Sequence, residues 1–309
     1  MQANNKKLLI MEFYHHYPSK FQDLLRRDYG SESYIGQGNP VSKILIIGKE
    51  CSAPKIRKDG KECIVPSPEF IQNAHTWKTK SPESIENWVN LPYYMPEKYH
   101  PRRPYLGQVL LENKKNNNGT SVTWKAYQQF INLLLPEDLQ VQPRQQLNFY
   151  EYCFLTELSS NCMPISKKNE TTKESIKQRL SANGILTHPF FKQFPVVILA
   201  VYHYIDWYKE IPIIQNFDGG IMNYIYKGIV VSKDEYSLYD EKTKKRLSLY
   251  RTNNGFKKGE FINVHESADG KHLLLHTNHF LDRNGYKLQP RSEIWMKELA
   301  DLVCPYLNK

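Results

Sequence analysis

The strongest constraint on the fold is a set of short apolar runs spaced along the chain. The first comprises residues 43–48 (KILIIG) and is rich in β-branched residues. Further runs occupy residues 152–158 (YCFLTEL), 195–201 (PVVILAV) and 272–275 (HLLL). An apolar run without polar alternation predicts a strand that is buried on both faces, as parallel sheets require. We therefore expect four central strands.

Segments with helical periodicity separate these runs. We expect helices near residues 174–183, closed by Gly184, and over residues 292–306 at the C-terminal end. A third helix is predicted after Thr123 and before Pro136, because its apolar residues share one face: Trp124, Tyr127, Ile131, Leu134 and Leu135. The alternation predicts an α/β fold, a three-layer α/β/α arrangement with a mostly parallel central four-stranded sheet.

The chain is expected to form one α/β domain over residues 1–309. Residues 1–39 are predicted as an N-terminal helical extension, in which Pro18 separates two short helices. Residues 210–270 contain short Tyr, Ile and Val runs between polar turns, a pattern that predicts a β-hairpin insertion. No internal repeat period occurs, which disfavours a solenoid or propeller.

Composition limits the classes of function. The chain of 309 residues has 42 Lys and Arg against 32 Asp and Glu, a net charge of +10 that favours binding to phosphate backbones. Its 5 cysteines include no CxxC pair, so neither a disulfide framework nor a zinc knuckle is predicted. No apolar run approaches the roughly 20 residues that span a bilayer. We expect a cytoplasmic protein without a cofactor.

The candidate site lies where the predicted strands end. In open α/β sheets, ligands bind beyond the carboxyl ends of the strands. The segments at these positions are 48–52 (GKECS), 157–161 (ELSSN), 202–204 (YHY) and 276–279 (HTNH). If the strands are parallel, these polar segments meet at one edge of the sheet.

The order of these segments resembles that of the uracil-DNA glycosylase superfamily. Members follow the first strand with a Gly-x-acid or Gly-Glu-x-Pro-Gly loop and the last strand with a His-containing loop. Residues 154–158 followed by Asn161-Cys162-Met163-Pro164 are similar to the branch whose second strand ends in Thr-Asn before a Cys-x-Pro turn. The resemblance covers roughly residues 40–65, 120–205 and 270–306, and it implies the fold and an activity on nucleobases.

The chain also departs from the family pattern. Cys51 and Ser52 replace the Pro-Gly of the first loop, Glu157 replaces the Asn, and Phe280 stands where Pro often follows the His. These changes put ordinary uracil specificity in doubt. The cysteine spacing of the iron–sulfur branch is missing, so no iron–sulfur cluster is expected.

The resemblance implies two catalytic residues. Glu50 would orient a water molecule and stabilise the oxocarbenium-like sugar, and His279 would donate a hydrogen bond to the leaving base. Structural alternatives remain: Glu50 as a cap or as an ion-pair partner of Lys49, Lys55 or Arg57, and His276 in place of His279. The other candidate base- or ligand-binding residues are Gly48, Lys49, Cys51, Ser52, Glu157, Asn161, His276 and Asn278.

Glu157 allows two interpretations. An ionised carboxylate only accepts hydrogen bonds, whereas the replaced amide also donates, so the change favours a base that presents donors. Alternatively, Glu157 forms an internal ion pair in a protein without glycosylase activity. Asn161 and Asn278 are candidate substitutes for base recognition.

Nucleic-acid contact is predicted in the loop-rich segment of residues 49–120. Arg102, Arg103 and Tyr105 combine charge and aromatic surface, which suits phosphate contact and base stacking. Other aromatic residues are expected to cover an extruded base: Phe70, Trp77, Tyr93 and Tyr94. The predicted partner is DNA or another nucleobase-containing ligand, and the predicted function is hydrolysis of an N-glycosidic bond. A noncatalytic nucleic-acid or nucleotide-binding module is the alternative.

Overall fold

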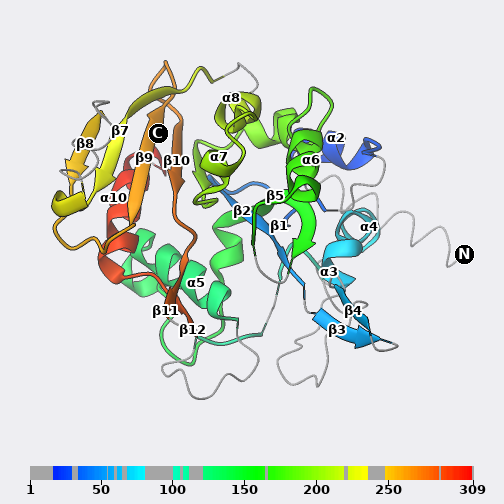
Figure 1. Ribbon diagram of the computed structural model, residues 1–309. Coiled ribbons are helices and arrows are strands. Elements are labelled where there is room, and N and C mark those ends of the chain that lie inside the picture. The colour runs from blue at the N-terminus through cyan, green and yellow to red at the C-terminus, as the bar shows by residue number, and fades with distance from the viewer. Residues whose placement is uncertain are drawn as a thin grey trace, which may run out of the picture.

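The computed structural model covers the whole chain and describes most of it (Figure 1). The described residues are 17–29, 34–53, 55–58, 61–64, 68–80, 100–104, 107–110, 121–163, 166–218, 222–235, 248–284 and 287–307. Backbone alone is described at 52, 55–58, 61–64, 68–69, 283–284 and 287.

A mixed sheet of eight strands forms the centre of the molecule, in the order β1-β5-β2-β6-β10-β9-β7-β8. Its first four strands in space are β1 (Gln37–Gly38), β5 (Cys153–Met163), β2 (Ile44–Ser52) and β6 (Val196–Leu199). The other four are β10 (Leu273–Thr277), β9 (Phe261–Glu266), β7 (Ile225–Val231) and β8 (Leu249–Thr252). The expected α/β class is confirmed.

The expected mostly parallel, four-stranded sheet is wrong. Strands β5, β2, β6 and β10 are parallel neighbours, and they correspond to the four apolar runs. Strand β1 pairs antiparallel with β5, and β9 pairs antiparallel with β10 and β7. An unpaired strand edge leaves a row of backbone hydrogen-bonding groups. Strand β9 pairs along the whole of β10, and β1 pairs with two residues of β5. They are short or partly exposed, so a search for long apolar runs overlooks them.

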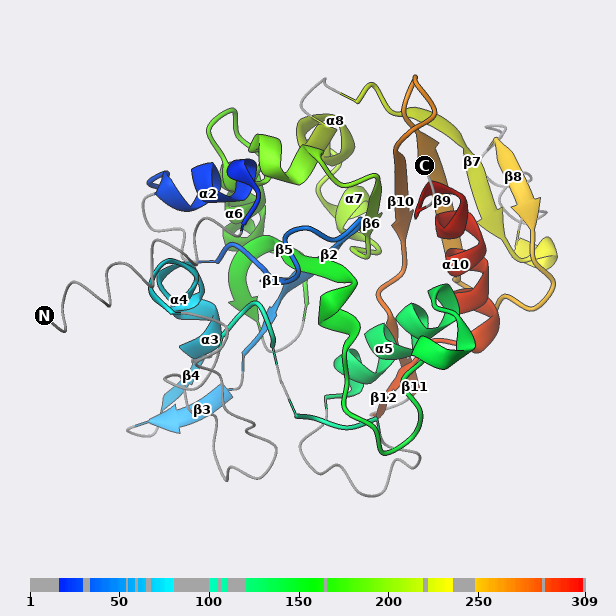
Figure 2. The same cartoon turned by 180° about the vertical axis from the view of Figure 1, so that it is seen from behind.

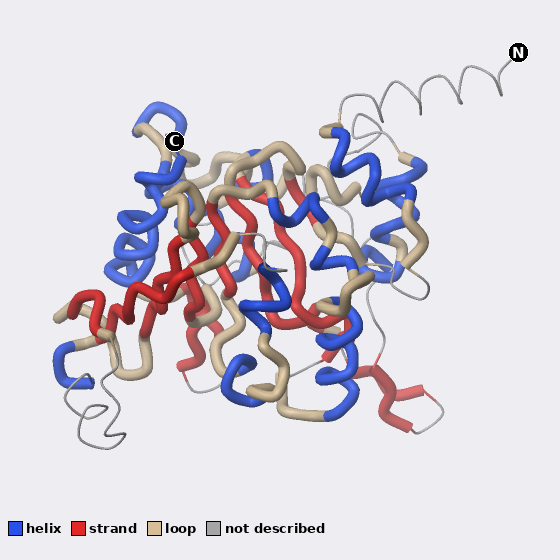
Figure 3. The backbone as a smooth tube through the Cα atoms, turned by 90° about the horizontal axis from the view of Figure 1, so that it is seen from above, coloured by secondary structure: helices blue, strands red, loops and turns tan. Residues whose placement is uncertain are grey.

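Alternate residues of the central strands enter two separate cores. Ile44 and Ile46 of β2 belong to one core, whereas Leu45 and Ile47 belong to the other. Because successive side chains of a strand point to opposite faces, both faces of the sheet are buried. Figure 3 shows helices on both sides of the strands.

Two helices cover the first face, α5 (Val122–Leu134) and α10 (Glu293–Leu307). Both lie close to their predicted positions. The side chain of Ser121 caps α5 by accepting a hydrogen bond from the Thr123 amide, and the helix ends just before Pro136, which cannot continue it. Trp295 of α10 is fully buried against the sheet.

The second face is covered by several shorter helices. They are α2 (Ser19–Arg26), α6 (Glu170–Arg179), α7 (Tyr204–Trp207), α8 (Ile213–Asp218) and the 3₁₀ turns η5 (Ile185–Thr187) and η6 (Pro189–Lys192). Helix α6 begins earlier than predicted because Asn169 caps it, accepting from the Thr172 amide. Of the predicted extension 1–39, residues 1–16 and 30–33 lie outside the described part; α2 follows Pro18.

The segment predicted as an insertion, residues 210–270, contains α8, β7, β8 and β9. Strands β7 and β9 do pair antiparallel, but they extend the central sheet, and β8 runs parallel to β7 at its edge (Figure 1). The boundaries of the predicted extension and insertion stay predictions.

The segment predicted as mostly loop, residues 49–120, begins inside β2, which continues beyond Gly48 to Ser52. It also contains a hairpin of β3 (Lys55–Lys58) and β4 (Lys61–Ile64), and the helices α3 (Pro68–Ile71) and α4 (Asn73–Thr79). The hairpin projects away from the central sheet (Figure 2). Among the described residues, no helix has the length and apolar composition needed to cross a membrane.

Gly36 is required where the chain enters β1. Its φ is 147°, and a Cβ atom there would lie 2.4 Å from the backbone oxygen of Leu155. Asn73 holds this turn, since its Oδ1 accepts from the Ile35 and Gly36 amides.

We expect Gly36→Ala to lower the free energy of unfolding by about 2 kcal/mol or more, because the new methyl group meets backbone that cannot move freely. Urea denaturation of wild type and variant measures the difference. Gly270→Ala is the matched control: Gly270 also has positive φ, 67°, but its nearest atom would be 3.7 Å away. Equal losses in the two variants would contradict the steric argument.

Candidate functional site

The hydrogen-bond register brings the predicted site segments to one edge of the sheet. Ile47 of β2 pairs with Leu199 of β6, and Leu199 pairs with His276 of β10. On the other side of β2, Gly48 pairs with Glu157 and Glu50 with Ser159. The residues that follow these pairs therefore project from the same, carboxyl, edge, as predicted for parallel strands.

Glu50 is half-buried at this edge, and its carboxylate has two described hydrogen-bond donors. Tyr204 Oη donates to Oε2, and Ser166 also bonds to the carboxylate. Burial raises the pKa of Glu50, while these two bonds and the charge of Lys49 oppose the rise. The side chains of Lys55 and Arg57, which were predicted as alternative partners, lie outside the described part.

Lys49 extends between the rings that follow β6. Its Nζ lies 5.5 Å from the ring centroids of both Tyr202 and Tyr204, a cation–π arrangement. Burial lowers the pKa of Lys49, the charge of Arg291 lowers it further, and Glu50 opposes the change. Tyr202 has a φ of 49°, a costly backbone conformation for a residue other than glycine.

His279 lies in the turn after β10, and its ring is held by the backbone. Nδ1 accepts a hydrogen bond of 3.1 Å from the Leu281 amide, so in the neutral ring the proton is on Nε2. Burial lowers the pKa of His279 to about 3, and the charges of Lys49 and Arg291 act in the same direction. His279 is therefore a neutral donor at pH 7.

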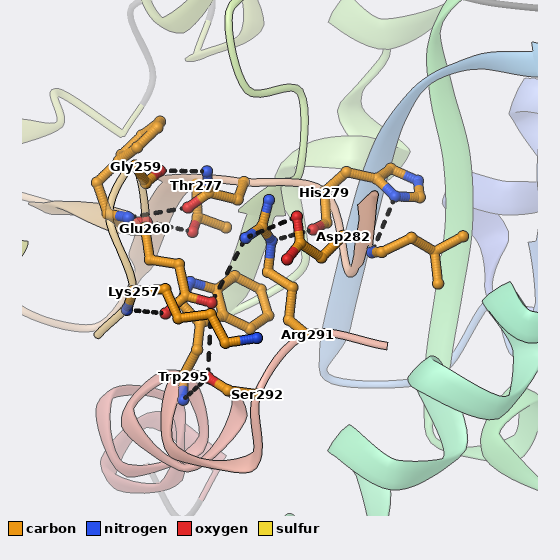
Figure 4. Close-up of polar contacts among 12 residues, drawn as sticks. Lys257, Gly259, Glu260, Thr277, His279, Asp282, Arg291, Ser292 and Trp295 are labelled. Atoms are coloured by element: carbon orange, nitrogen blue, oxygen red, sulfur yellow. Dashed lines mark hydrogen bonds and ion pairs between the residues drawn. The ribbon is translucent and has the colours of Figure 1, made fainter. Parts of the chain in front are cut away.

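Arg291 is a site residue that the sequence analysis missed. It follows β12 (Lys287–Pro290), which pairs with β11 (Leu281–Asn284). Figure 4 shows Arg291 between Glu260 and the His279 turn. Its Nε donates to the His279 carbonyl at 2.7 Å, and Nη1 lies 3.5 Å from Glu260 Oε1. No motif surrounds Arg291, so only the pairing of β11 with β12 reveals its position.

Glu157 lies directly against Gly48. A Cβ atom on Gly48 would be 2.2 Å from Glu157 Oε2. The carboxyl group of Glu157 therefore fits here because glycine has no side chain. Oε2 is buried without a hydrogen-bond partner among the described residues. Burial raises the pKa of Glu157 to about 8; Glu50 adds to the rise and Arg179 opposes it. Glu157 is then mostly protonated at pH 7, and within the described chain it forms no ion pair.

Three of the predicted ligand-binding residues form hydrogen bonds to other segments of the protein. His276 Nε2 bonds to the Tyr202 carbonyl at 2.9 Å and its Nδ1 to Asn263. Asn278 bonds to the backbone of Phe261 and Gly259. Asn161, which lies in β5 rather than in a turn, donates to Thr172 Oγ1. Both ring nitrogens of His276 are therefore hydrogen-bonded. The Nε2 donor of His279, by contrast, has no hydrogen-bond partner among the described residues.

Cys51 and Ser52 lie in the last part of β2, where its pairing with β5 becomes irregular after Glu50. Cys51 is half-buried and packs against a small cluster that includes Tyr34, Phe70 and Cys162. The side chain of Ser52 is outside the described part.

The predicted nucleic-acid contact lies at the opposite edge of the sheet. Arg102 pairs with Glu151 at 2.6 Å, Arg103 lies 3.7 Å from the same carboxylate, and Glu151 precedes the first residue of β5. From Cys153 to Ser159 a strand advances about 20 Å. Arg102 and Arg103 are thus remote from Glu50, because Gly38 of β1 donates a hydrogen bond to the Pro101 carbonyl and so holds their segment near the amino end of β5. Tyr105 lies outside the described residues.

The described aromatic residues that were expected to cover a base are packed inside the protein. Trp77 is fully buried in the core and donates to the Gly36 carbonyl. Phe70 stacks on Tyr34 with ring centroids 4.3 Å apart. Tyr93 and Tyr94 lie outside the described part. Tyr202 and Tyr204 are the aromatic residues that border Lys49 and Glu50.

Comparison of the chain with models of protein families, with curated proteins and with solved structures found no match. The arrangement of the site residues is therefore the basis for a functional proposal.

We expect Glu157→Gln to weaken the pH dependence of stability. The folded-state pKa of about 8 lies above the ordinary value of 4.5, so this group stabilises the fold below pH 4.5 and loses that contribution as pH rises through 8. Between pH 6 and pH 9 the wild type should lose roughly 2–3 kcal/mol from this group, and Gln should lose none. Urea denaturation at both pH values tests this, with exposed Glu174→Gln as the control. A variant with the wild-type pH dependence would refute the assignment.

We expect His279 to remain neutral from pH 7 to pH 5. Its pKa in the folded protein is about 3, against an ordinary 6.5, so the unfolded chain binds this proton first and the group contributes to a loss of stability as pH falls from 6.5 to 3. NMR titration of the ring Cε1–H signal, assigned with His279→Gln, measures the protonation. The same signal in urea-unfolded protein serves as control, and a native midpoint near 6.5 would contradict the buried state.

Proposed function

We propose that the chain binds a nucleobase-containing ligand, in the first place DNA with an extruded base, and hydrolyses the N-glycosidic bond. The supporting observation is that Glu50 and His279, from opposite parts of the sequence, project from the same edge of the sheet and both interact electrostatically with Lys49. The resemblance to uracil-DNA glycosylases, which assigns an acid and a histidine to these positions, supports the same proposal.

The chemistry requires two groups with different protonation states. Departure of a base leaves positive charge on the sugar and negative charge on the base. An ionised Glu50 stabilises the sugar and orients the attacking water, and the donors Tyr204 and Ser166 together with Lys49 favour its ionised form. The neutral His279 donates through Nε2 to the departing base.

Glu157 adds a candidate contact to the base. A protonated carboxylic acid has both an O–H donor and a carbonyl acceptor, as the amide of the family pattern has. An ionised Glu157 would only accept hydrogen bonds, but burial beside Gly48 and the charge of Glu50 disfavour the ionised form. In the proposed complex, Glu157 pairs with a base edge that presents both an acceptor and a donor.

One observation favours the noncatalytic alternative. The amides of Asn161 and Asn278 and both ring nitrogens of His276 are engaged in hydrogen bonds within the protein. These polar groups are therefore not free to form hydrogen bonds with a base. A noncatalytic binding module would need only Lys49, Arg291 and the tyrosine rings.

Oligonucleotides that contain uracil, hypoxanthine, xanthine or an alkylated base test the proposal. Base release is detected by alkaline cleavage of the abasic product. We expect release from at least one substrate, with Glu50→Gln lowering the single-turnover rate by about 10²–10⁴-fold because the amide cannot carry the stabilising negative charge. Glu174→Gln, on an exposed part of α6, should retain the wild-type rate.

Measurement of DNA binding at two salt concentrations distinguishes the alternatives. Salt-sensitive binding without base release from any substrate would replace the glycosylase proposal by the noncatalytic one. Undiminished release by Glu50→Gln, in a variant with unchanged thermal stability, would remove Glu50 from the mechanism.

A further inference from the structure

Lys49 has an environment that differs from that of an ordinary surface lysine. It is half-buried at the carboxyl edge, next to Glu50 in the chain, and its Nζ lies over two tyrosine rings. Within the described residues, no carboxylate oxygen lies within the 4.0 Å that defines an ion pair with Nζ. Among the described residues, the ammonium group is thus held in place by rings rather than by a counterion.

The charges around Lys49 come from several of the elements at this edge. The groups that interact with it electrostatically are Glu50 of β2, His203 after β6, His279 after β10 and Arg291 after β12. Burial and Arg291 both disfavour the ammonium form, whereas Glu50 and the two tyrosine rings favour it. Desolvation and a neighbouring cation are the two conditions that make a lysine amine nucleophilic at neutral pH.

A nucleophilic amine at this position has a matching electrophile. Hydrolysis of an N-glycosidic bond in DNA leaves an abasic deoxyribose, whose ring-opened form carries an aldehyde at C1′. The proposed reaction would produce this aldehyde beside Glu50, the residue adjacent to Lys49.

We propose that Lys49 is an amine nucleophile that forms an imine with the C1′ aldehyde of an abasic site. The choice of substrate rests on the proposed function, but the reaction goes beyond base hydrolysis and gives the site a second activity, covalent capture of abasic DNA.

The step balances without a cofactor. The unprotonated Nζ attacks C1′ and forms a C–N bond, and the carbonyl oxygen takes up a proton to give a carbinolamine. Loss of this oxygen as water, after a further proton transfer, leaves the protonated imine. Water releases the sugar by the reverse reaction, and added borohydride instead delivers hydride to C1′, which yields a stable secondary amine.

Borohydride trapping tests the inference directly. Wild-type protein is mixed at saturating concentration with a duplex oligonucleotide that carries one preformed abasic site, and sodium borohydride is added. We expect a covalent adduct of protein and DNA, which tandem mass spectrometry assigns to the peptide containing Lys49. Lys49→Arg keeps the positive charge but lacks the nucleophilic amine, and it should trap at least about tenfold less DNA.

Lys43→Arg is the matched control. Lys43 is exposed, immediately precedes the same strand at its opposite end, and should leave trapping unchanged. Lys49→Met, which keeps the aliphatic stem, provides a second variant if the guanidinium group disturbs the fold. Binding of uncleaved abasic DNA is measured alongside, so that lost capture is separated from lost affinity. Wild-type trapping in Lys49→Arg, an adduct at another residue, or no wild-type adduct overturns the inference.

The two proposals fail separately. The preformed abasic site makes base release unnecessary. Trapping at Lys49 without release of any damaged base would therefore contradict the glycosylase proposal and leave the role of Lys49 intact. Base release without an adduct would leave that proposal intact and remove the role of Lys49.

Discussion

The register that joins β5, β2, β6 and β10 is the constraint on which the site depends. Parallel pairing aligns Ile47, Leu199 and His276 across the sheet, so the chain leaves each strand at the same edge. The burial of both faces maintains this register, because a slip of one residue would exchange the side chains of the two cores. Strands β2 and β10, which are separated by more than two hundred residues, thereby end at the same edge with β6 between them.

Burial at this edge changes the protonation of the groups gathered there. Removal of water disfavours every charged form, so Glu157 holds its proton, His279 lacks one, and Lys49 gives up its proton more easily. Burial raises the pKa of Glu50 as well, but Tyr204 and Ser166 donate to its carboxylate and oppose the rise. Burial, together with these two hydrogen bonds, therefore places an acid, a neutral donor, an amine and a candidate carboxylate within one region.

The sequence predicted the edge of the sheet at which the candidate residues lie better than it predicted the hydrogen-bond partners of each residue. Apolar runs identify buried strands and the polar residues that follow them, which is why Glu50 and His279 could be predicted to lie at the carboxyl edge of the sheet. Asn278 and His276 have equally suitable positions in sequence, but their hydrogen bonds to neighbouring strands depend on β9, which was not predicted as part of the sheet. The position of Arg102 at the other edge could not be predicted, because the contact of Gly38 with Pro101 and the pairing of β1 with β5 are nonlocal.

Local patterns determined the α/β class, the four parallel strands and the helices α5 and α10, because hydrophobic periodicity and capping act over a few residues. The tertiary structure alone decided the eight-stranded sheet, the role of Arg291 and the protonation of Glu157. Long-range strand pairing and desolvation both depend on atoms that are distant in sequence but surround a group in space. The residue pattern of a single segment cannot predict which atoms these are.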